Sequence, residues 1–404
     1  MSDNEIRRTL ADSVRRNLTE NILPYWMNTM VDPAGGFYGR RDGYDRLHAD
    51  AHKGAVLAGR LLWSFSAAYR VLGDPAYRVM ADRALDALID RFYDHEYGGV
   101  YWSVSADGSP ADTHKQFYAL GFAIYGLAEY VAAVGTGDER GRRALDYAVK
   151  LFGDIEAHSR DCVDGGYIEA TARDWSPIAD MRLSAKDMNV AKSMNTHLHI
   201  IEPYTRLFAV WPDESLAEAI RSLLAVFMQR IEDSATHHLG LFFDHRWRRS
   251  DATVSYGHDI EASWLLLESA LALGDHELVE VVRGHCASIA MAALEGLQPD
   301  GSMIYECHRD GALDLERHWW VQAELLVGQL YLWKYHGRAD MLGQAWNTWC
   351  YIDSHIVDHV AGEWFWSCDG VTGAACRDND KAGFWKCPYH NTRMCLEALA
   401  VLRL

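Results

Sequence analysis

The sequence predicts an all-α fold, an (α/α)6 barrel of twelve helices with short β-hairpins in the loops on one face. Two observations predict this fold. A glycine–aromatic motif recurs six times, and helices of two alternating kinds fill the intervals between the motifs. Repeats of this kind indicate the whole architecture, because each repeat is one unit of a larger array. Since barrels often run longer than average domains, residues 1–404 are expected to form a single catalytic domain.

The repeated motif is a glycine followed closely by aromatic or β-branched residues, and it returns roughly every 60 to 75 residues. Glycine permits a tight turn, and the residues after it favour a brief strand. Each motif therefore predicts a short hairpin inside a loop. The six motifs begin at Gly35, Gly98, Gly165, Gly240, Gly301 and Gly362.

The helical patterns between the motifs alternate between amphipathic and almost wholly apolar. The odd-numbered helices are amphipathic and predict an outer ring, whereas apolar even-numbered helices such as 117–125 predict a buried inner ring. Connections from even to odd helices are short, and those from odd to even are long. The long loops and the starts of the inner helices thus share one face, where binding is expected. The predicted spans are 4–30, 51–72, 76–92, 112–134, 138–157, 187–210, 214–231, 255–273, 276–295, 315–336, 340–358 and 380–403.

Polar residues gather near the starts of the predicted inner helices, although a buried helix rarely carries polar groups without a reason. A single buried histidine is more often structural than catalytic, but three at comparable depth, His199, His258 and His390, favour catalysis. His197 lies on another helix face and is interpreted as structural, as are His237 and His238 in a loop. Other polar and tryptophan residues of the same region are Arg60, Lys115, Gln116, Tyr118, Lys192, Asn195, Asp259, Glu261, Trp319, Trp320, Gln322, Glu324, Trp385, Lys386, Asn391 and Arg393.

Several partners and cofactors are not expected. The histidines lack the spacing of a metal motif, and no nucleotide-binding glycine motif is present, so neither a metal nor another cofactor is predicted. A net charge of −18 argues against nucleic acid and anionic membranes as partners. The sequence contains no uninterrupted run of 18 apolar residues, so no membrane span is predicted. The amino-terminal segment lacks the apolar core of a signal peptide, and the eight cysteines are scattered, so we expect a cytoplasmic protein without disulfides.

The expected partner is a small-molecule sugar. The chain holds 15 tryptophans, and flat aromatic faces suit the C–H faces of sugar rings, while an indole N–H can bind a hydroxyl. Of these tryptophans, Trp63 and Trp264 are interpreted as core residues, whereas Trp319 and Trp385 are candidates for substrate contact. The protein is expected to be a monomer or a weak homodimer.

Five segments carry a family resemblance. They are 115–125, 192–204, 255–264, 319–324 and 385–391, and together they resemble the signatures of cellobiose 2-epimerases, within the N-acylglucosamine 2-epimerase superfamily. The resemblance runs from about residue 30 to the carboxyl terminus. One departure is Glu202-Pro203, where Glu-Ala is expected, and the proline predicts a kink in the sixth helix.

The resemblance implies a cofactor-independent 2-epimerase that interconverts reducing-end glucose and mannose in β-1,4-linked disaccharides, such as cellobiose, or lactose to epilactose. By motif, His258 and His390 match the acid/base pair of the family. The remaining residues that match family site positions are His199 as a further catalytic residue, and Arg60, Tyr118, Asn195, Glu261, Trp319 and Trp385 as substrate-binding residues.

The mechanism expected from these residues begins on the open-chain aldehyde. One histidine removes the C2 proton to give an enediolate, and the other returns a proton to the opposite face after rotation about C2–C3. Helix starts disfavour a positive charge and should keep both imidazoles neutral. Arg60 would stabilise the enediolate oxygens. His199 would assist ring opening, and Glu261 would orient His258 or bind a hydroxyl.

Three alternatives stay open at this point. The same fold could serve an epimerase or isomerase of free D-mannose. A glycoside hydrolase would need two carboxylates across a bond, but Asp259 and Glu261 lie on different faces of one helix. A non-catalytic binding role is the third, since one superfamily member is described as a renin-binding protein. The sequence leaves open the preferred sugar, the extent of aldose–ketose isomerisation, the oligomeric state, and which histidine deprotonates which epimer.

Overall fold

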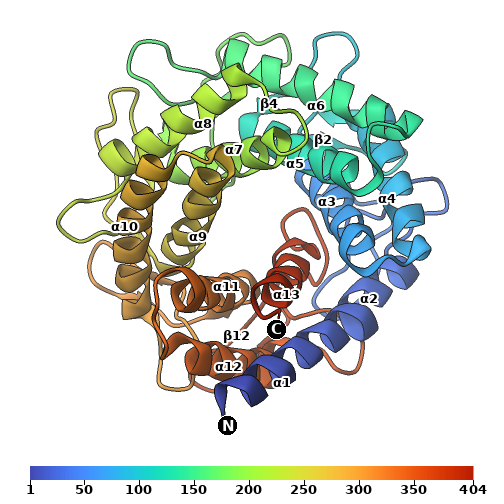
Figure 1. Ribbon diagram of the computed structural model, residues 1–404. Helices are drawn as coiled ribbons and strands as arrows, with labels where there is room; N and C mark the ends of the chain where they lie inside the picture. The colour runs from blue at the N-terminus through green and yellow to red at the C-terminus, as the bar shows by residue number, and fades with distance from the viewer. Residues whose placement is uncertain (404) are drawn as a thin grey trace.

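Two concentric rings of helices form a barrel in the computed structural model, which describes residues 1–403 (Figure 1). The predicted (α/α)6 fold class is confirmed. The inner ring consists of α3 (Ala55–Leu72), α5 (Phe117–Val134), α7 (Met194–Phe208), α9 (Tyr256–Leu273), α11 (Trp319–Tyr335) and α13 (Tyr389–Val401). The outer ring consists of α1 (Asp3–Arg16), continued through η1 (Asn17–Ile22) into α2 (Leu23–Thr29), then α4 (Pro75–Ala87), α6 (Glu139–His158), α8 (Glu214–Val226), α10 (His276–Ala293) and α12 (Met341–Tyr351).

The short connections between an inner helix and the next outer helix have a recurrent chemistry. Gly73 and Gly274 take left-handed conformations just after α3 and α9, which a side chain would disfavour. An aspartate then accepts hydrogen bonds from the first free N–H groups of the next outer helix. The four capping aspartates are Asp74, Asp138, Asp213 and Asp275.

Three outer helices end in a wider, π-type turn before the chain enters the long loops. These turns are η2 (Leu88–Phe92) after α4, η3 (Phe227–Ile231) after α8 and η5 (Ile352–Ile356) after α12. In each, the N–H of the first residue after the turn donates to the carbonyl five residues earlier, and the backbone of the donating residue is extended. A short 3-10 turn, η4 (Leu294–Gly296), takes this place after α10. The shared ending sends the chain into the loops in the same way in these three repeats.

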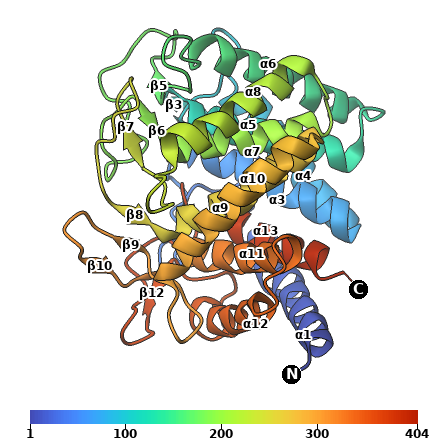
Figure 2. The same cartoon turned by 60° about the vertical axis from the view of Figure 1, so that its left-hand side comes forward.

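Six equivalent turns lie at the glycine–aromatic motifs, each closed by a single bridge such as Tyr93 to Val100 or Arg160 to Tyr167. In the fourth, the bridge joins Glu232 to Leu239, just before Gly240, and His237 takes the left-handed conformation. Longer hairpins follow three of the six turns: β2 (Ser103–Val104) with β3 (Pro110–Asp112), β9 (Glu306–Cys307) with β10 (Leu313–Asp314), and β12 (Ser367–Cys368) with β13 (Ala375–Cys376). The predicted hairpins are therefore present, and the strands gather at one end of the barrel (Figure 2).

The remaining strands join neighbouring repeats, which the sequence did not predict. A two-residue strand precedes five of the inner helices, and it pairs with a strand from the next repeat. A bridge between Arg41 and Ala382 joins the first repeat to the last. The pairs are β1 (Lys53–Gly54) with β2, β4 (Lys115–Gln116) with β5 (Ala170–Thr171), β6 (Lys192–Ser193) with β7 (Phe242–Phe243), β8 (Val254–Ser255) with β9, and β11 (Arg317–His318) with β12.

These strands correct the predicted helix starts. Five of the six inner helices begin four to nine residues later than predicted, because the preceding residues are extended or in loops. Lys115 and Lys192 lie on strands, where each Nζ reaches a buried or nearly buried aspartate at the end of the preceding outer helix, Asp94 at 2.9 Å and Asp161 at 2.8 Å. Trp385 lies in the loop before α13 rather than on the helix. The ion pairs fix the starts of the inner helices against the outer ring.

Helix α5 is long and apolar enough, by length and composition, to cross a membrane, although no such span was predicted. Most of it is buried, because α3 and α7 pack against its sides in the inner ring. Its one acidic residue, Glu129, is bound by Arg70 and Arg206. Its apolar character follows from its place inside the barrel.

Candidate active site

The three candidate histidines lie in the first two turns of three inner helices, at the end of the barrel that carries the long loops. His199 is on α7, His258 on α9 and His390 on α13. The ring of Trp320 packs against two of them, with centroids 4.7 Å from His258 and 5.8 Å from His390. Trp320 belongs to the polar cluster at the predicted inner-helix starts, but its sequence position alone indicates no role.

Each histidine is held through its Nδ1 atom. His199 bonds to Glu202 Oε2 at 2.9 Å and His390 to Glu324 Oε1 at 2.6 Å, whereas His258 bonds to Ser255 Oγ at 2.8 Å. A carboxylate only accepts, so His199 and His390 donate from Nδ1, and a neutral imidazole held in this way keeps a free lone pair on Nε2. Free Nε2 atoms are what acid–base catalysis requires.

The surroundings keep two of these imidazoles neutral. Burial, with a smaller contribution from His199, lowers the pKa of His258 to about 3. Burial also lowers the pKa of His390 well below its usual range, helped by the positive charges of Arg60 and Arg393. The neutral state expected from the sequence is thus supported, but desolvation is the main cause rather than the helix ends.

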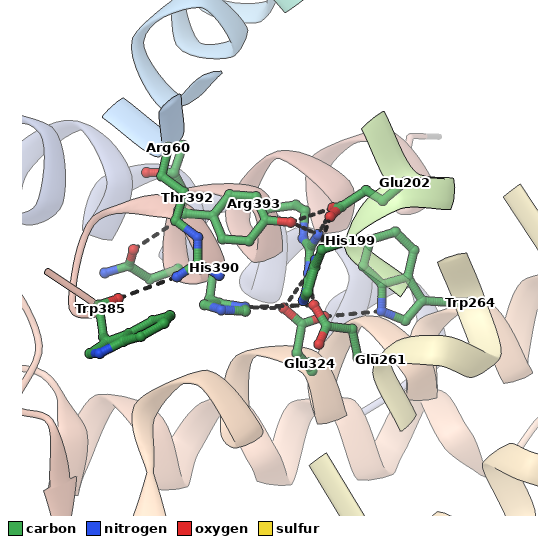
Figure 3. Close-up of polar contacts among 12 residues, drawn as sticks. Arg60, His199, Glu202, Glu261, Trp264, Glu324, Trp385, His390, Thr392 and Arg393 are labelled. Carbon is green, nitrogen blue, oxygen red and sulfur yellow. Dashed lines mark hydrogen bonds and ion pairs between the residues drawn. The ribbon is translucent and has the colours of Figure 1, made fainter. Parts of the chain in front are cut away.

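A single buried arginine organises the carboxylates behind the histidines (Figure 3). Arg393 donates to Glu202, and its Nη2 lies 2.6 Å from both Glu261 Oε1 and Glu324 Oε1. Burial opposes ionisation of Glu202, but Arg393 and His199 outweigh it and lower its pKa to about 2. Burial and the charge of Glu324 raise the pKa of Glu261 to about 7.

Glu261, Glu324 and His390 bring ligand atoms within 4.8 Å of one another, a spacing that also suits a metal ion. Here the guanidinium of Arg393 contacts both carboxylates, and the Nδ1 atom of His390 is hydrogen-bonded to Glu324. The positive charge at this position is therefore supplied by the chain itself. That the protein uses no metal stays a prediction.

Several site residues hold polar groups that no neighbour satisfies. Arg60 donates to Tyr118 Oη at 2.9 Å and to the Trp385 carbonyl at 3.3 Å, but within residues 1–403 it makes no ion pair. Buried atoms without a partner in the described chain include Arg60 Nε, Asn195 Oδ1 and Trp319 Nε1. Since buried polar atoms are normally paired, these atoms suit a polar ligand.

The structure settles two of the structural interpretations. His197 Nδ1 donates to the Ser193 carbonyl at 2.7 Å, and its Nε2 accepts the Tyr167 N–H at 2.9 Å, so it ties a loop to α7. His238 donates to Asp259 Oδ2 at 2.7 Å, which joins a loop to α9. Both histidines have their hydrogen-bonding groups engaged in structural contacts.

Of the two roles expected for Glu261, orienting His258 is wrong, and binding a substrate hydroxyl stays a prediction. Ser255 holds that imidazole instead, while Glu261 faces Arg393 and lies 3.9 Å from His390 Nδ1. One helical turn in sequence brings two side chains to the same side of a helix, but Arg393 on α13 draws the carboxylate toward itself. The roles of Glu324 and Arg393 were missed because their partners lie on other helices. Those of Glu202 and Ser255 were missed although each lies only three residues from its histidine, and Glu202 shares a helix with His199.

Pro203 lies inside α7, and the helix continues through it from Met194 to Phe208. Because proline has no N–H, the carbonyl of His199 loses its helical donor. Gly121 of α5 packs directly against that carbonyl, where a side chain would overlap it. The proline therefore leaves His199 in the site, with its backbone pressed against α5.

The barrel and this site together fit a class: an enzyme that acts on a small polar ligand. The particular family follows from comparison. The chain belongs to the N-acylglucosamine 2-epimerase (GlcNAc 2-epimerase) family, whose sequence model matches residues 36–392.

Individual relatives agree with this membership. The chain is 53% identical to a cellobiose 2-epimerase from Bacteroides fragilis, over 96% of this chain and 98% of the relative. It superposes with a TM-score of 0.91 on the structure of cellobiose 2-epimerase from Bacillus thermoamylovorans, at 36% identity and covering 97% and 99% of the two chains. A D-mannose isomerase structure gives a TM-score of 0.83 at 19% identity, with 96% and 97% covered, which shows a shared fold.

Proposed function

We propose that this protein is a cofactor-independent 2-epimerase that interconverts glucose and mannose at the reducing end of β-1,4-linked disaccharides. The observation that carries the proposal is the pair His258 and His390, both against Trp320 and both with Nδ1 engaged. Two fixed imidazoles near one ring are suited to serving the two faces of one carbon. The cytoplasm is the compartment in which we propose that it acts.

The reaction starts from the open-chain aldehyde, whose carbonyl makes the C2 proton acidic. One imidazole takes that proton on Nε2, and the electron pair moves into an enediolate. After rotation about C2–C3, the other histidine, which has taken up one proton from solvent, gives that proton to the opposite face of C2, and the first histidine returns its proton to solvent. The two histidines exchange roles when the reaction runs in reverse, so no atom is gained or lost. Arg60 carries no carboxylate partner, so its charge is free to stabilise the enediolate oxygens.

His199 has a role in ring opening in this scheme. Glu202 holds its Nδ1–H, and its ring lies against Tyr118 with a centroid distance of 5.0 Å. A free Nε2 at this place can exchange a proton with the ring oxygen or the anomeric hydroxyl of the substrate. Asn195 Oδ1 and Trp319 Nε1 supply further unpaired polar atoms for sugar hydroxyls.

An aromatic cluster beside Arg60 favours a disaccharide over free mannose. The Trp385 ring lies 5.8 Å from Trp102 and 5.5 Å from Phe384, and 6.0 Å from Tyr118 in the site. Such faces suit a second sugar ring that continues from the reacting one. The high identity to a relative named cellobiose 2-epimerase supports the same substrate class.

The test is incubation of the purified protein with cellobiose, lactose and D-mannose, followed by NMR of the products. The expected result is conversion of cellobiose to glucosyl-mannose and of lactose to epilactose, with D-mannose turned over much more slowly. Faster conversion of D-mannose to a ketose would contradict the substrate class, and no turnover of any sugar would contradict the proposed function.

A further inference from the structure

The Arg393 guanidinium is enclosed on every side at the centre of the barrel. Its side chain is 1% exposed. It lies over the faces of Trp264 and Tyr389, with distances of 4.7 and 4.4 Å to the ring centroids. Two aromatic faces leave a guanidinium little freedom except in its own plane.

Arg393 also meets three carboxylates from three different inner helices. Glu202 comes from α7, Glu261 from α9 and Glu324 from α11, while Arg393 itself comes from α13 (Figure 3). One cation therefore joins four of the six inner helices at the level of the site. The planar fork of arginine can satisfy several acceptors at once, which the ammonium of lysine does less well.

Two of those carboxylates are the acceptors that orient histidines. Glu202 binds His199 Nδ1 through Oε2, and Glu324 binds His390 Nδ1 through the same Oε1 that receives Arg393. The third, Glu261, approaches His390 Nδ1 to 3.9 Å. The positions of two imidazoles are thus set through groups that Arg393 holds.

Removing the positive charge would leave three buried carboxylates facing one another. Burial already raises the pKa of Glu324, and contact with Arg393 is what opposes that rise. Without the guanidinium, mutual repulsion would favour protonated or displaced carboxyl groups. A protonated or displaced carboxyl no longer fixes the proton on Nδ1, and the Nε2 atom of the imidazole loses its alignment.

We propose that Arg393 is a positioning residue for the reaction, a built-in cation that holds Glu202 and Glu324 where they orient His199 and His390. The inference rests on the proposed function, because turnover is its readout. Arg393 acts through the histidines, so its loss lowers kcat and leaves KM nearly unchanged. It also takes the place that a metal ion would need beside Glu261, Glu324 and His390.

The experiment compares Arg393→Lys and Arg393→Ala with the unmodified protein, using cellobiose as substrate. Arg206→Ala is the matched control, because Arg206 also binds a buried carboxylate, Glu129 at 2.5 Å, but lies near the opposite end of an inner helix. Thermal melting of each variant reports whether it folds. Assays are repeated with guanidinium chloride at concentrations of tens of millimolar, well below those that unfold proteins.

The expected result is that Arg393→Lys and Arg393→Ala lose kcat by ~10- to 100-fold or more while KM changes little. Guanidinium restores part of the activity of Arg393→Ala and does nothing for Arg206→Ala, which keeps the kcat of the unmodified protein. If Arg393→Ala does not fold, the kcat and KM of Arg393→Lys decide the matter alone.

Normal kcat in a folded Arg393→Lys would overturn the inference. So would a folded Arg393→Ala whose lost activity guanidinium fails to restore, or a loss that falls on KM rather than kcat. An unmodified protein that turns over none of the sugars would instead overturn the proposed function, so the two failures are distinguishable.

Discussion

The inner ring has a catalytic end, at the helix starts that carry His199, His258 and His390, and a distal end, at the helix ends near Glu129. Both ends bury charged groups, but they differ in whether those groups have a charged partner. At the distal end, Glu129 is bound by Arg70 at 2.6 Å and by Arg206 at 2.5 Å. At the catalytic end, Arg60 pairs with no carboxylate in the described chain, and Asn195 Oδ1 stays unpaired. Buried charge is therefore no sign of a site by itself; what marks this end is the combination of unpaired polar atoms with three histidines.

Two further carboxyls at the distal end, those of Glu268 and Glu397, make no ion pair with an arginine in the described chain. Burial and the charge of Glu397 raise the pKa of Glu268 to about 8, so this carboxyl is protonated at neutral pH. Tyr331 Oη donates to Glu397 at 3.4 Å. The two ends thus share similar residue types, while only the catalytic end combines them with histidines whose Nδ1 atoms are held.

The largest expected effect is at the catalytic end. His258→Ala or His390→Ala should lower kcat by about 10²- to 10⁴-fold while the melting temperature stays near that of the unmodified protein, because each removes one proton carrier. Initial rates with cellobiose measure this. Tyr331→Phe is the control at the distal end and should keep normal turnover. Near-normal activity of either histidine variant would remove the distinction between the ends.

The barrel was predictable because its repeat is visible in the sequence as regularly spaced glycines and alternating helical periodicity. The site was predictable in part, since histidines near the starts of apolar helices stand out against a buried background. The links from Glu324 and Arg393 to His390 were not predictable, because α11 and α13 meet only through the closure of the ring. The link from Glu202 to His199 follows helical spacing within α7 and could have been predicted. The inner-helix starts were placed too early because two-residue strands carry no periodic signal.

A second prediction concerns the packing beneath His199. Gly121→Ala would drive a methyl group into the His199 carbonyl and should cost ~1–3 kcal/mol or somewhat more of unfolding free energy, with lower kcat. Urea unfolding and initial rates measure both. Gly153→Ala is the matched control, because nothing lies within 4 Å of the added atom on exposed α6, and it should stabilise slightly. Equal behaviour of the two variants would contradict the tight contact.

At the distal end, Glu129→Gln should affect stability and spare catalysis. It leaves Arg70 and Arg206 without their carboxylate, and since both arginines are partly exposed the cost should be only about 2 kcal/mol. The kcat for cellobiose should stay normal. A large loss of turnover in a folded variant would mean that the two ends are coupled.

Glu261→Gln tests how ionisation of the buried Glu261 carboxyl affects the stability of the protein. The folded pKa of Glu261 is raised to about 7, above its unfolded value, so the folded state binds its proton more tightly and loses stability as pH rises through that window. The glutamine variant has no carboxyl at this position, so it does not lose stability through this ionisation as pH rises. It should be more stable than the unmodified protein by on the order of 1 kcal/mol at pH 8, with the gap closing toward pH 5. Urea midpoints across this range provide the measurement, and a gap that widens toward low pH would contradict the sign.

The smallest expected effect is that of a chelator. Since Arg393 supplies the positive charge beside Glu261, Glu324 and His390, EDTA should leave turnover unchanged. Loss of activity with EDTA that a divalent ion restores would show that the catalytic end needs a metal after all.

The central claim is that two imidazoles work on opposite faces of C2, and hydrogen exchange at that carbon tests it most directly. In heavy water, the unmodified protein should form a product with deuterium at C2. His258→Ala and His390→Ala should each wash deuterium into only one of the two epimers, without inversion, and the two variants should differ in which one. Product that retains its original hydrogen at C2, or variants that both exchange the same epimer, would contradict the account.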